Sequence, residues 1–442
     1  MSGEKAPKKQ SFLQGVAVLT AATIIVKLLG FIYKVPLQNI LQERGFGYFN
    51  TAYDVYNVLL MISTTGLPVA VSRMISQAQA LENYAQIRKI YSVSMKVFLT
   101  IGVIGTLVML VFCKPLSVMV TTNENSWAAI AALSPCVLLI CIVSAHRGFF
   151  QGQSNMTPTS VSQVYEAMIR VAFGLGGAYL MLKKTGSLVY AAAGGIFGVT
   201  AGCIVAVVYL RIQFGKSNQI LRQGGGEAKS TRQTMKELLV IAIPITLSAS
   251  MVSIITLIDT SLVQGQLQNA LGYTLKETRH LYGTYSSGMN LYNLPSSMMT
   301  ALTISVIPTV SASLARNDRV HTSRVINSSL RVTGLMAFPM GLGLWALAEP
   351  IMKLCYPRYD SELGGSLLAV LGIASMFVCL MLISNSILQS YGRVHVPVFT
   401  MLIGGVVKII FNYNLTAVPS INIHAAPFGT LVCFVIVSSL NL

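Results

Sequence analysis

The stretch GYFNTAYDVYNVLLMISTTG, residues 47–66, has a counterpart in GTYSSGMNLYNLPSSMMTAL, residues 283–302. The counterpart lies 236 residues further along the chain and repeats a glycine, a tyrosine and an asparagine at the same spacing. The matching pairs are Gly47 and Gly283, Tyr56 and Tyr292, and Asn57 and Asn293. Agreement at one fixed offset indicates that the chain consists of two related halves.

Both stretches also carry a polar stripe along an otherwise apolar helix. Its residues step by four and three, so they share one helix face. In the first half they are Asn50, Asp54, Asn57, Met61 and Thr64, and their counterparts are Ser286, Asn290, Asn293, Ser297 and Thr300. Because a polar face in contact with hydrocarbon is unfavourable, we expect it to line protein or water. Asn57, Asn290 and Asn293 are therefore candidate substrate-binding residues.

The composition is that of a membrane protein. Of the 442 residues, 53% are hydrophobic and only 10% are charged, whereas a soluble domain carries about 25% charged residues. A helix needs about 20 consecutive apolar residues to span a bilayer, and stretches of about this length recur along the chain. We expect helices near residues 12–35, 48–72, 91–113, 126–147, 159–182 and 188–213, and then near 237–264, 280–313, 323–347, 364–390, 396–418 and 425–442.

The predicted fold is therefore an all-α polytopic membrane protein with about twelve transmembrane helices in two six-helix bundles around a central cavity. We place the first bundle at residues 1–213 and the second at 237–442. Residues 214–236 are polar and include three consecutive glycines, which is typical of a cytoplasmic linker. Related halves that meet at a midplane cavity are a transporter architecture.

The 31 Lys and Arg residues outnumber the 14 Asp and Glu residues, and most of the basic residues in loops fall on the side of the amino terminus. This asymmetry predicts a multi-pass protein of the cytoplasmic membrane with a cytoplasmic amino terminus, and it disfavours nucleic-acid binding. The sequence has no P-loop, nucleophile elbow or metal-ligand cluster of His and Cys, so we expect neither an enzyme nor a bound cofactor. Coupling to an ion gradient or to the membrane potential stays open.

Three cations fall in the middle of predicted helices: Lys27, Arg170 and Lys408. A Lys or Arg at a helix centre costs about 2.5 to 3.5 kcal/mol on insertion scales, so each needs a compensating environment. A substrate anion would supply one, and we take the three as candidate phosphate-binding residues. Arg147, which opens the junction RGFFQGQSNMTP, is a fourth candidate.

The acids inside predicted helices offer alternative partners. Glu166 lies four residues before Arg170, which permits an intrahelical ion pair instead of a substrate contact. Lys408 has no acid three or four residues away, so it requires either a substrate anion or an acid on another helix. Asp54 and Asp259 are candidates for binding a coupling cation or proton, or for pairing with these cations.

Four stretches together resemble a known family: VKLLGFIYKVPL from Val26, GYFNTAYDVYNVLLMISTTGLPVAVSRMIS from Gly47, RGFFQGQSNMTPTSVSQV from Arg147 and YNLPSSMMTALTISVIPTVSASLA from Tyr292. They are similar to the polysaccharide-exporter and lipid-flippase branch of the multidrug/oligosaccharidyl-lipid/polysaccharide (MOP) exporter superfamily, and within it to the stage V sporulation protein B-like group related to lipid II flippases.

The resemblance implies two lobes around a cavity that opens to each side of the membrane in turn, with cations holding a lipid pyrophosphate. Lys27 falls where lipid II flippases carry a basic residue in an RxLGF-like motif, which reads KLLGF here. Asn290 and Asn293 stand where that group is expected to have an Arg and an acid. Family members usually have fourteen helices, so either the last two are absent here or the sequence is a piece of a longer chain.

The expected function is translocation of an undecaprenyl-pyrophosphate-linked peptidoglycan or polysaccharide precursor from the inner to the outer leaflet. Its partners would be this lipid-linked sugar pyrophosphate, membrane lipids and proteins of cell-wall synthesis. Two alternatives stay open, namely a cation-coupled multidrug antiporter of the same superfamily and a membrane scaffold for cell-wall synthesis that transports nothing.

Overall fold

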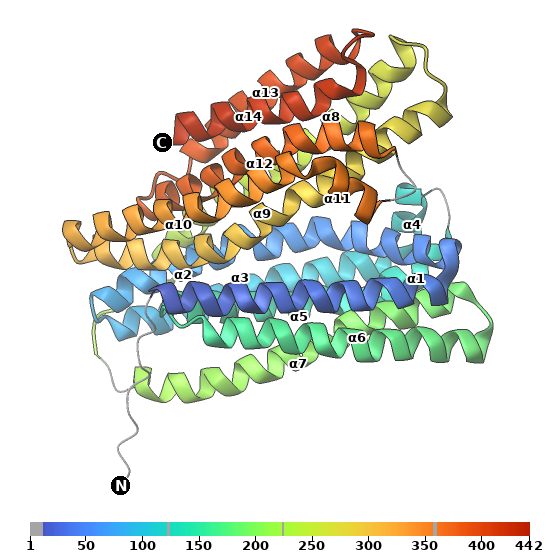
Figure 1. Cartoon of the computed structure of the whole chain (residues 1–442). Helices are drawn as coiled ribbons and strands as arrows, with labels where there is room; N and C mark the ends of the chain where they lie inside the picture. The colour runs from blue at the N-terminus through green and yellow to red at the C-terminus, as the bar shows by residue number, and fades with distance from the viewer. Residues whose placement is uncertain (1–11, 122–123, 223–224, 357–359) are drawn as a thin grey trace. The chain divides into compact units, whose positions relative to one another are not determined.

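The structure is a computed structural model, and it describes residues 12–121, 124–222, 225–356 and 360–442. The basic amino terminus that orients the chain in the prediction lies outside these residues. All regular structure in the described ranges is helical (Figure 1). The helices are α1 Phe12–Thr64, α2 Gly66–Ala80, α3 Tyr84–Val111, α4 Cys113–Thr121, α5 Trp127–Gly152, α6 Thr157–Thr185, α7 Leu188–Arg222, α8 Thr231–Asn269, α9 Leu275–Ala315, α10 Arg319–Ala346, α11 Ala348–Cys355, α12 Ser361–Ser390, α13 Val396–Thr416 and α14 Ala425–Asn441, with single 3₁₀ turns at Glu124–Ser126 and Asn422–His424.

Nine of the described helical segments are long and apolar enough to cross a membrane. A tenth results if α10 and α11, which are bent by 77° at their junction, form one broken span. This confirms the prediction of an all-α protein with many membrane spans.

The first predicted pair of helices appears as one helical segment that folds back on itself. The rings of Tyr33 and Phe49 lie 6.0 Å apart, although a straight helix would separate residues this far apart in sequence by about 24 Å. Figure 1 shows α1 reversing direction after the span Gln14–Leu41 and returning toward α2. The predicted helices at 12–35 and 48–72 therefore correspond to the two arms of α1, and the second arm ends at Thr64, just before α2.

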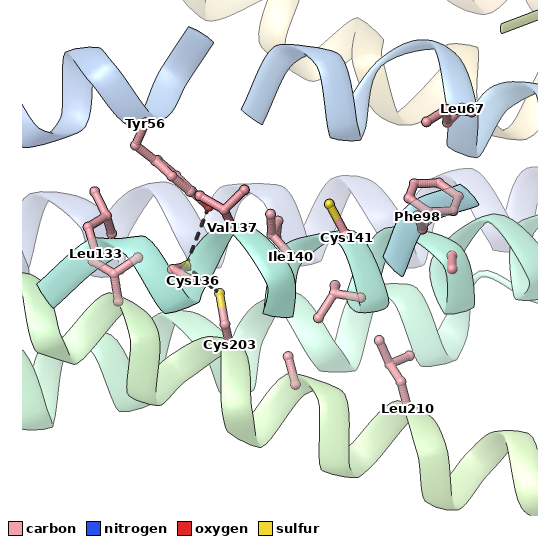
Figure 2. Packing of buried hydrophobic residues seen from close by; sticks show 14 of the residues in the cluster. Tyr56, Leu67, Phe98, Leu133, Cys136, Val137, Ile140, Cys141, Cys203 and Leu210 are labelled. Carbon is pink, nitrogen blue, oxygen red and sulfur yellow. Dashed lines mark hydrogen bonds between the residues drawn. The ribbon is translucent and has the colours of Figure 1, made fainter. Parts of the chain in front are cut away.

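The chain divides into two compact units. The first comprises Met1–Thr246 together with Ser311–Asn317. Inside it α7 packs against α6 and α5, and α5 also contacts α3 and α1. Figure 2 shows part of its core, where Tyr56 of α1 points toward Cys136 of α5 and Cys203 of α7 lies beside it. The Tyr56 hydroxyl lies 3.5 Å from Cys136 Sγ, and the two sulfur atoms lie 3.2 Å apart.

The second unit comprises Leu247–Val310 and Asp318–Leu442. Here α12 packs against α10, α11 and α14, and α13 packs against α14. Tyr285 and Tyr292 of α9 are buried in its core among leucines of α12. The bundle limits expected from the sequence, 1–213 and 237–442, stay a prediction.

The sequence repeat has a structural counterpart in the burial of its residues. Tyr56 and Tyr292, which match at the offset of 236, are each only 4% exposed and belong to the cores of their respective units. Asn57 and Asn293, the next residue in each copy, are both exposed. Each copy of the motif therefore turns its tyrosine inward and its asparagine outward.

The described part of the polar linker is tied to the turn between α2 and α3. Asn83 Nδ2 donates to the carbonyl oxygen of Glu227 at 2.8 Å, and the backbone nitrogen of Lys229 donates to Gln86 Oε1 at 2.8 Å. Gly226 has a φ of +119°, and a Cβ at this position would meet the side chain of Asn83. The path of the linker therefore requires glycine at position 226.

We predict that Gly226→Ala destabilises the protein by about 1 to 3 kcal/mol, because alanine must adopt a strained φ and push against Asn83. The measurement is the thermal unfolding midpoint of the purified protein in detergent. Gly225→Ala is the matched control, since a Cβ there meets nothing within 4 Å. Equal midpoints for the two variants would contradict the prediction.

Candidate functional site

Lys27 lies on the exposed side of α1. Its neighbours Ile24 and Leu28 are also largely exposed, at 42% and 60%. Lys27 forms no ion pair with any side chain that the structure describes. Within the described part of the chain, the first mid-helix cation of the sequence therefore has no ion-pair partner.

Arg147, Glu166 and Arg170 form a three-residue cluster in the first unit. Glu166 Oε1 lies 2.6 Å from Arg170 Nη2 on the same helix, and Glu166 Oε2 lies 3.0 Å from Arg147 Nη2 on α5. Arg147 Nε also donates to Ser162 Oγ at 3.0 Å. All three side chains are at most 26% exposed. The structure therefore contains the intrahelical pair that the spacing permits, and it adds Arg147 as a second partner.

This cluster carries one more positive charge than negative charge. Arg170 Nε is buried and has no hydrogen-bond partner among the described residues. Among the described residues, Glu166 is the one acid that forms an ion pair with Arg147 or Arg170. A buried excess charge is costly unless a counter-charge approaches it, so the cluster can attract an anion.

Close packing of α7 holds the cluster in place. A Cβ at Gly202 of α7 would lie 2.5 Å from the carbonyl oxygen of Glu166, and one at Gly198 would lie 2.7 Å from that of Arg170. The α7 backbone thus touches α6 at the two residues that form the ion pair. Small residues allow such close approach of membrane helices, and here they determine where the Glu166 and Arg170 side chains begin.

Lys408 has a different environment in the second unit. Its Nζ lies 2.9 Å from Asp259 Oδ2, and the two side chains are only 6% and 5% exposed. Asn412 Nδ2 donates to the other carboxylate oxygen of Asp259. Of the two partners expected for Lys408, the structure supplies the acid on another helix, because Asp259 belongs to α8 and Lys408 to α13. Both oxygens of Asp259 are engaged. The pair is electrically neutral because the positive charge of Lys408 offsets the negative charge of Asp259.

The remaining candidates lie on exposed faces or outside the described side chains. Asn57, Asn290 and Asn293 are all exposed. The side chain of Asp54 lies outside the described residues, and its predicted role stays a prediction.

Ser162, which contacts Arg147, and Asn412, which contacts Asp259, were not predicted from the sequence. Both had a signal that could have revealed them, since each lies four residues from a charged member of its cluster, Glu166 and Lys408 respectively. The contact between Arg147 and Glu166 joins two helices, and no spacing rule within one helix could have shown it.

We predict that removing either partner of the buried pair, by Lys408→Met or by Asp259→Leu, lowers stability by about 3 to 5 kcal/mol, because the remaining charge is left buried without a partner. The double variant should recover most of this loss. Unfolding midpoints of the four proteins in detergent measure the effect.

Lys229→Met provides the control, because Lys229 and Glu237 form an exposed pair whose loss should cost less than about 1 kcal/mol. If both single variants at the buried pair are as stable as this control, Lys408 and Asp259 do not depend on each other.

Solved structures share this multi-span helical fold. An outward-facing multidrug resistance MATE transporter of the MOP superfamily aligns with a TM-score of 0.82 at 11% identity, over 99% of this chain and 97% of the other. The polysaccharide biosynthesis protein family matches residues 12–314, and the MatE family matches residues 244–414. The chain therefore belongs to the polysaccharide biosynthesis protein family of MOP transporters and is not an enzyme.

Three relatives from Bacillus subtilis (strain 168) match almost the whole chain. The uncharacterized membrane protein YabM is 28% identical over 98% of this chain and 80% of its own length. Stage V sporulation protein B is 25% identical over 98% and 83%, and the lipid II flippase MurJ is 27% identical over 91% and 77%. The family resemblance seen in the sequence motifs is thereby confirmed.

Proposed function

We propose that this transporter moves a saccharide precursor linked to undecaprenyl pyrophosphate from the inner to the outer leaflet by alternating access. The observation that carries the proposal is Lys27, a cation in the middle of a membrane span with no described partner. A cation held at that depth needs an anion, and a pyrophosphate supplies one. The relationship to a lipid II flippase and to a polysaccharide biosynthesis family supports the same substrate class.

The candidate cations have different roles, because some are neutralised by an acid and others are not. Lys27 and the cluster of Arg147 and Arg170 have positive charge to offer to a phosphate. Lys408 does not, because Asp259 already neutralises it. We therefore place phosphate binding in the first unit and give Lys408 a role in holding α13 to α8.

The membrane potential can drive this transport without a coupling ion. Moving one elementary charge across the membrane changes its free energy by about 2.3 kcal/mol per 100 mV. The cytoplasmic side of the membrane is at negative potential. A pyrophosphate anion that leaves this side therefore lowers its free energy by this amount for each of its negative charges. The engagement of both Asp259 oxygens agrees with this scheme, because a coupling cation at Asp259 would have to displace Lys408 or Asn412.

The alternative of a cation-coupled multidrug antiporter draws on the MatE match over residues 244–414. It would require Asp259 to be open to a cation, and the ion pair with Lys408 opposes this. A scaffold without transport would leave Lys27, which pairs with no described side chain, without a purpose.

We predict that Lys27→Ala lowers translocation of a lipid-linked disaccharide pyrophosphate in proteoliposomes at least about tenfold, because the loss of one phosphate contact of about 1.4 kcal/mol or more has this effect on a rate. Lys27→Arg should retain most of the activity, since it keeps the charge. The assay follows the arrival of the labelled precursor in the opposite leaflet.

Lys34→Ala is the matched control, because Lys34 is also exposed on α1 and lies about two turns away. Transport by Lys27→Ala at the rate of the wild-type protein would refute the assignment of Lys27. Failure of the wild-type protein to move the precursor at all would refute the proposed function.

A further inference from the structure

The membrane-spanning part of α9 is free of charge but has a polar face. Between His280 and Ala315 the sequence contains no Asp, Glu, Lys or Arg. Four polar side chains nevertheless recur on one exposed face of this span, namely Ser286, Asn290, Asn293 and Thr300. An exposed polar row without a single charge distinguishes α9 from α1, whose exposed face carries Lys27 and Lys34.

The hydroxyl groups along this part of α9 are occupied by its own backbone. Ser296 Oγ donates to the carbonyl oxygen of Asn293 at 3.0 Å, and Thr300 Oγ1 donates to that of Ser296 at 3.3 Å. The amides of Asn290 and Asn293, in contrast, form no hydrogen bond with any described residue. An unsatisfied amide in hydrocarbon costs several kcal/mol, so these two groups require water or a polar ligand.

The orientation of the two amides is set by the opposite side of the helix. Tyr285, Tyr292 and Met299 are between 1% and 4% exposed and anchor α9 in the core of the second unit. Because Asn293 follows Tyr292 directly, burial of the tyrosine turns the asparagine outward. The exposed face is therefore a consequence of core packing.

The chemistry of this face selects a class of ligand. Each amide can donate and accept hydrogen bonds at once, as the hydroxyl and acetamido groups of a sugar do. A phosphate would find no cation here, and a metal ion or an organic cation would find no carboxylate. The match to the polysaccharide biosynthesis protein family extends to residue 314 and so includes α9.

We propose that Asn290 and Asn293 form a sugar-recognition face that hydrogen-bonds to the neutral saccharide head of the transported lipid. The inference rests on the proposed function and deepens it. The uncharged face of α9 recognises the sugar through hydrogen bonds to its hydroxyl and acetamido groups. Discrimination between a glycosylated lipid and the bare lipid pyrophosphate then belongs to α9.

The test compares the binding of two probes to the purified full chain in nanodiscs. One is undecaprenyl pyrophosphate, and the other is the same lipid carrying one N-acetylhexosamine. We expect the wild-type protein to bind the glycosylated lipid about tenfold more tightly, a ratio that corresponds to about 1.4 kcal/mol. The double variant Asn290→Leu and Asn293→Leu should lose this ratio and keep its affinity for the bare lipid.

Two further variants support the comparison. Ser296→Ala removes a hydroxyl that serves only its own helix and should leave the ratio unchanged. Asn290→Ser combined with Asn293→Ser keeps polar groups on the face and should give a ratio between those of the wild-type protein and the leucine variant, which separates recognition from a failure to fold.

The outcomes are distinct for the two proposals. Equal affinity of the wild-type protein for both lipids would overturn the sugar-recognition face and leave the proposed function standing. An unchanged ratio in the leucine variant, or an equal loss of affinity for both lipids, would also overturn it. If the wild-type protein binds neither lipid, the proposed function fails and the inference fails with it.

Discussion

The cost of holding a positive charge inside a membrane is the constraint on which the arrangement of this protein depends. Three cations fall in the middle of predicted helices, and each meets this cost differently. Arg170 pairs with Glu166 on its own helix, Lys408 pairs with Asp259 across two helices, and Lys27 is exposed without a described partner. Since Arg147 shares Glu166 with Arg170, the first unit keeps a surplus of positive charge, whereas the buried pair of the second unit is neutral.

The two copies of the internal repeat agree in the packing of their residues but differ in the placement of charge. Tyr56 and Tyr292 are buried alike, and the asparagines that follow them are exposed alike. The acids that neutralise Arg170 and Lys408 have no such correspondence, because one comes from α6 and the other from α8. A mid-helix cation demands an acid nearby, but several neighbouring positions can supply it, so the two halves could reach neutrality by separate routes. The span of α9 from His280 to Ala315 contains no Asp, Glu, Lys or Arg at all.

Local spacing and composition predicted the helical membrane class, the repeat and most helix positions, because apolar length and period are properties of one segment. They could not predict that the arms of α1 form one helical segment or that the helix ends at Thr64, since such details depend on packing against other helices. In the site, the contact of Glu166 with Arg170 followed from spacing, whereas the contacts of Arg147 with Glu166 and of Lys408 with Asp259 join different helices. The lack of an acid near Lys408 in sequence showed only that a distant partner was needed.

A transporter must release what it binds, and the distribution of charge suits this requirement. Two buried arginines without an acid would hold a pyrophosphate too strongly, because attraction between charges grows as water is excluded. Glu166 offsets one of the two charges. Under the proposed sugar recognition, water can replace the hydrogen bonds of the uncharged α9 amides at little cost. Under the proposed function, this partial neutralisation by Glu166 lets the cluster of Arg147, Glu166 and Arg170 attract a pyrophosphate and still release it.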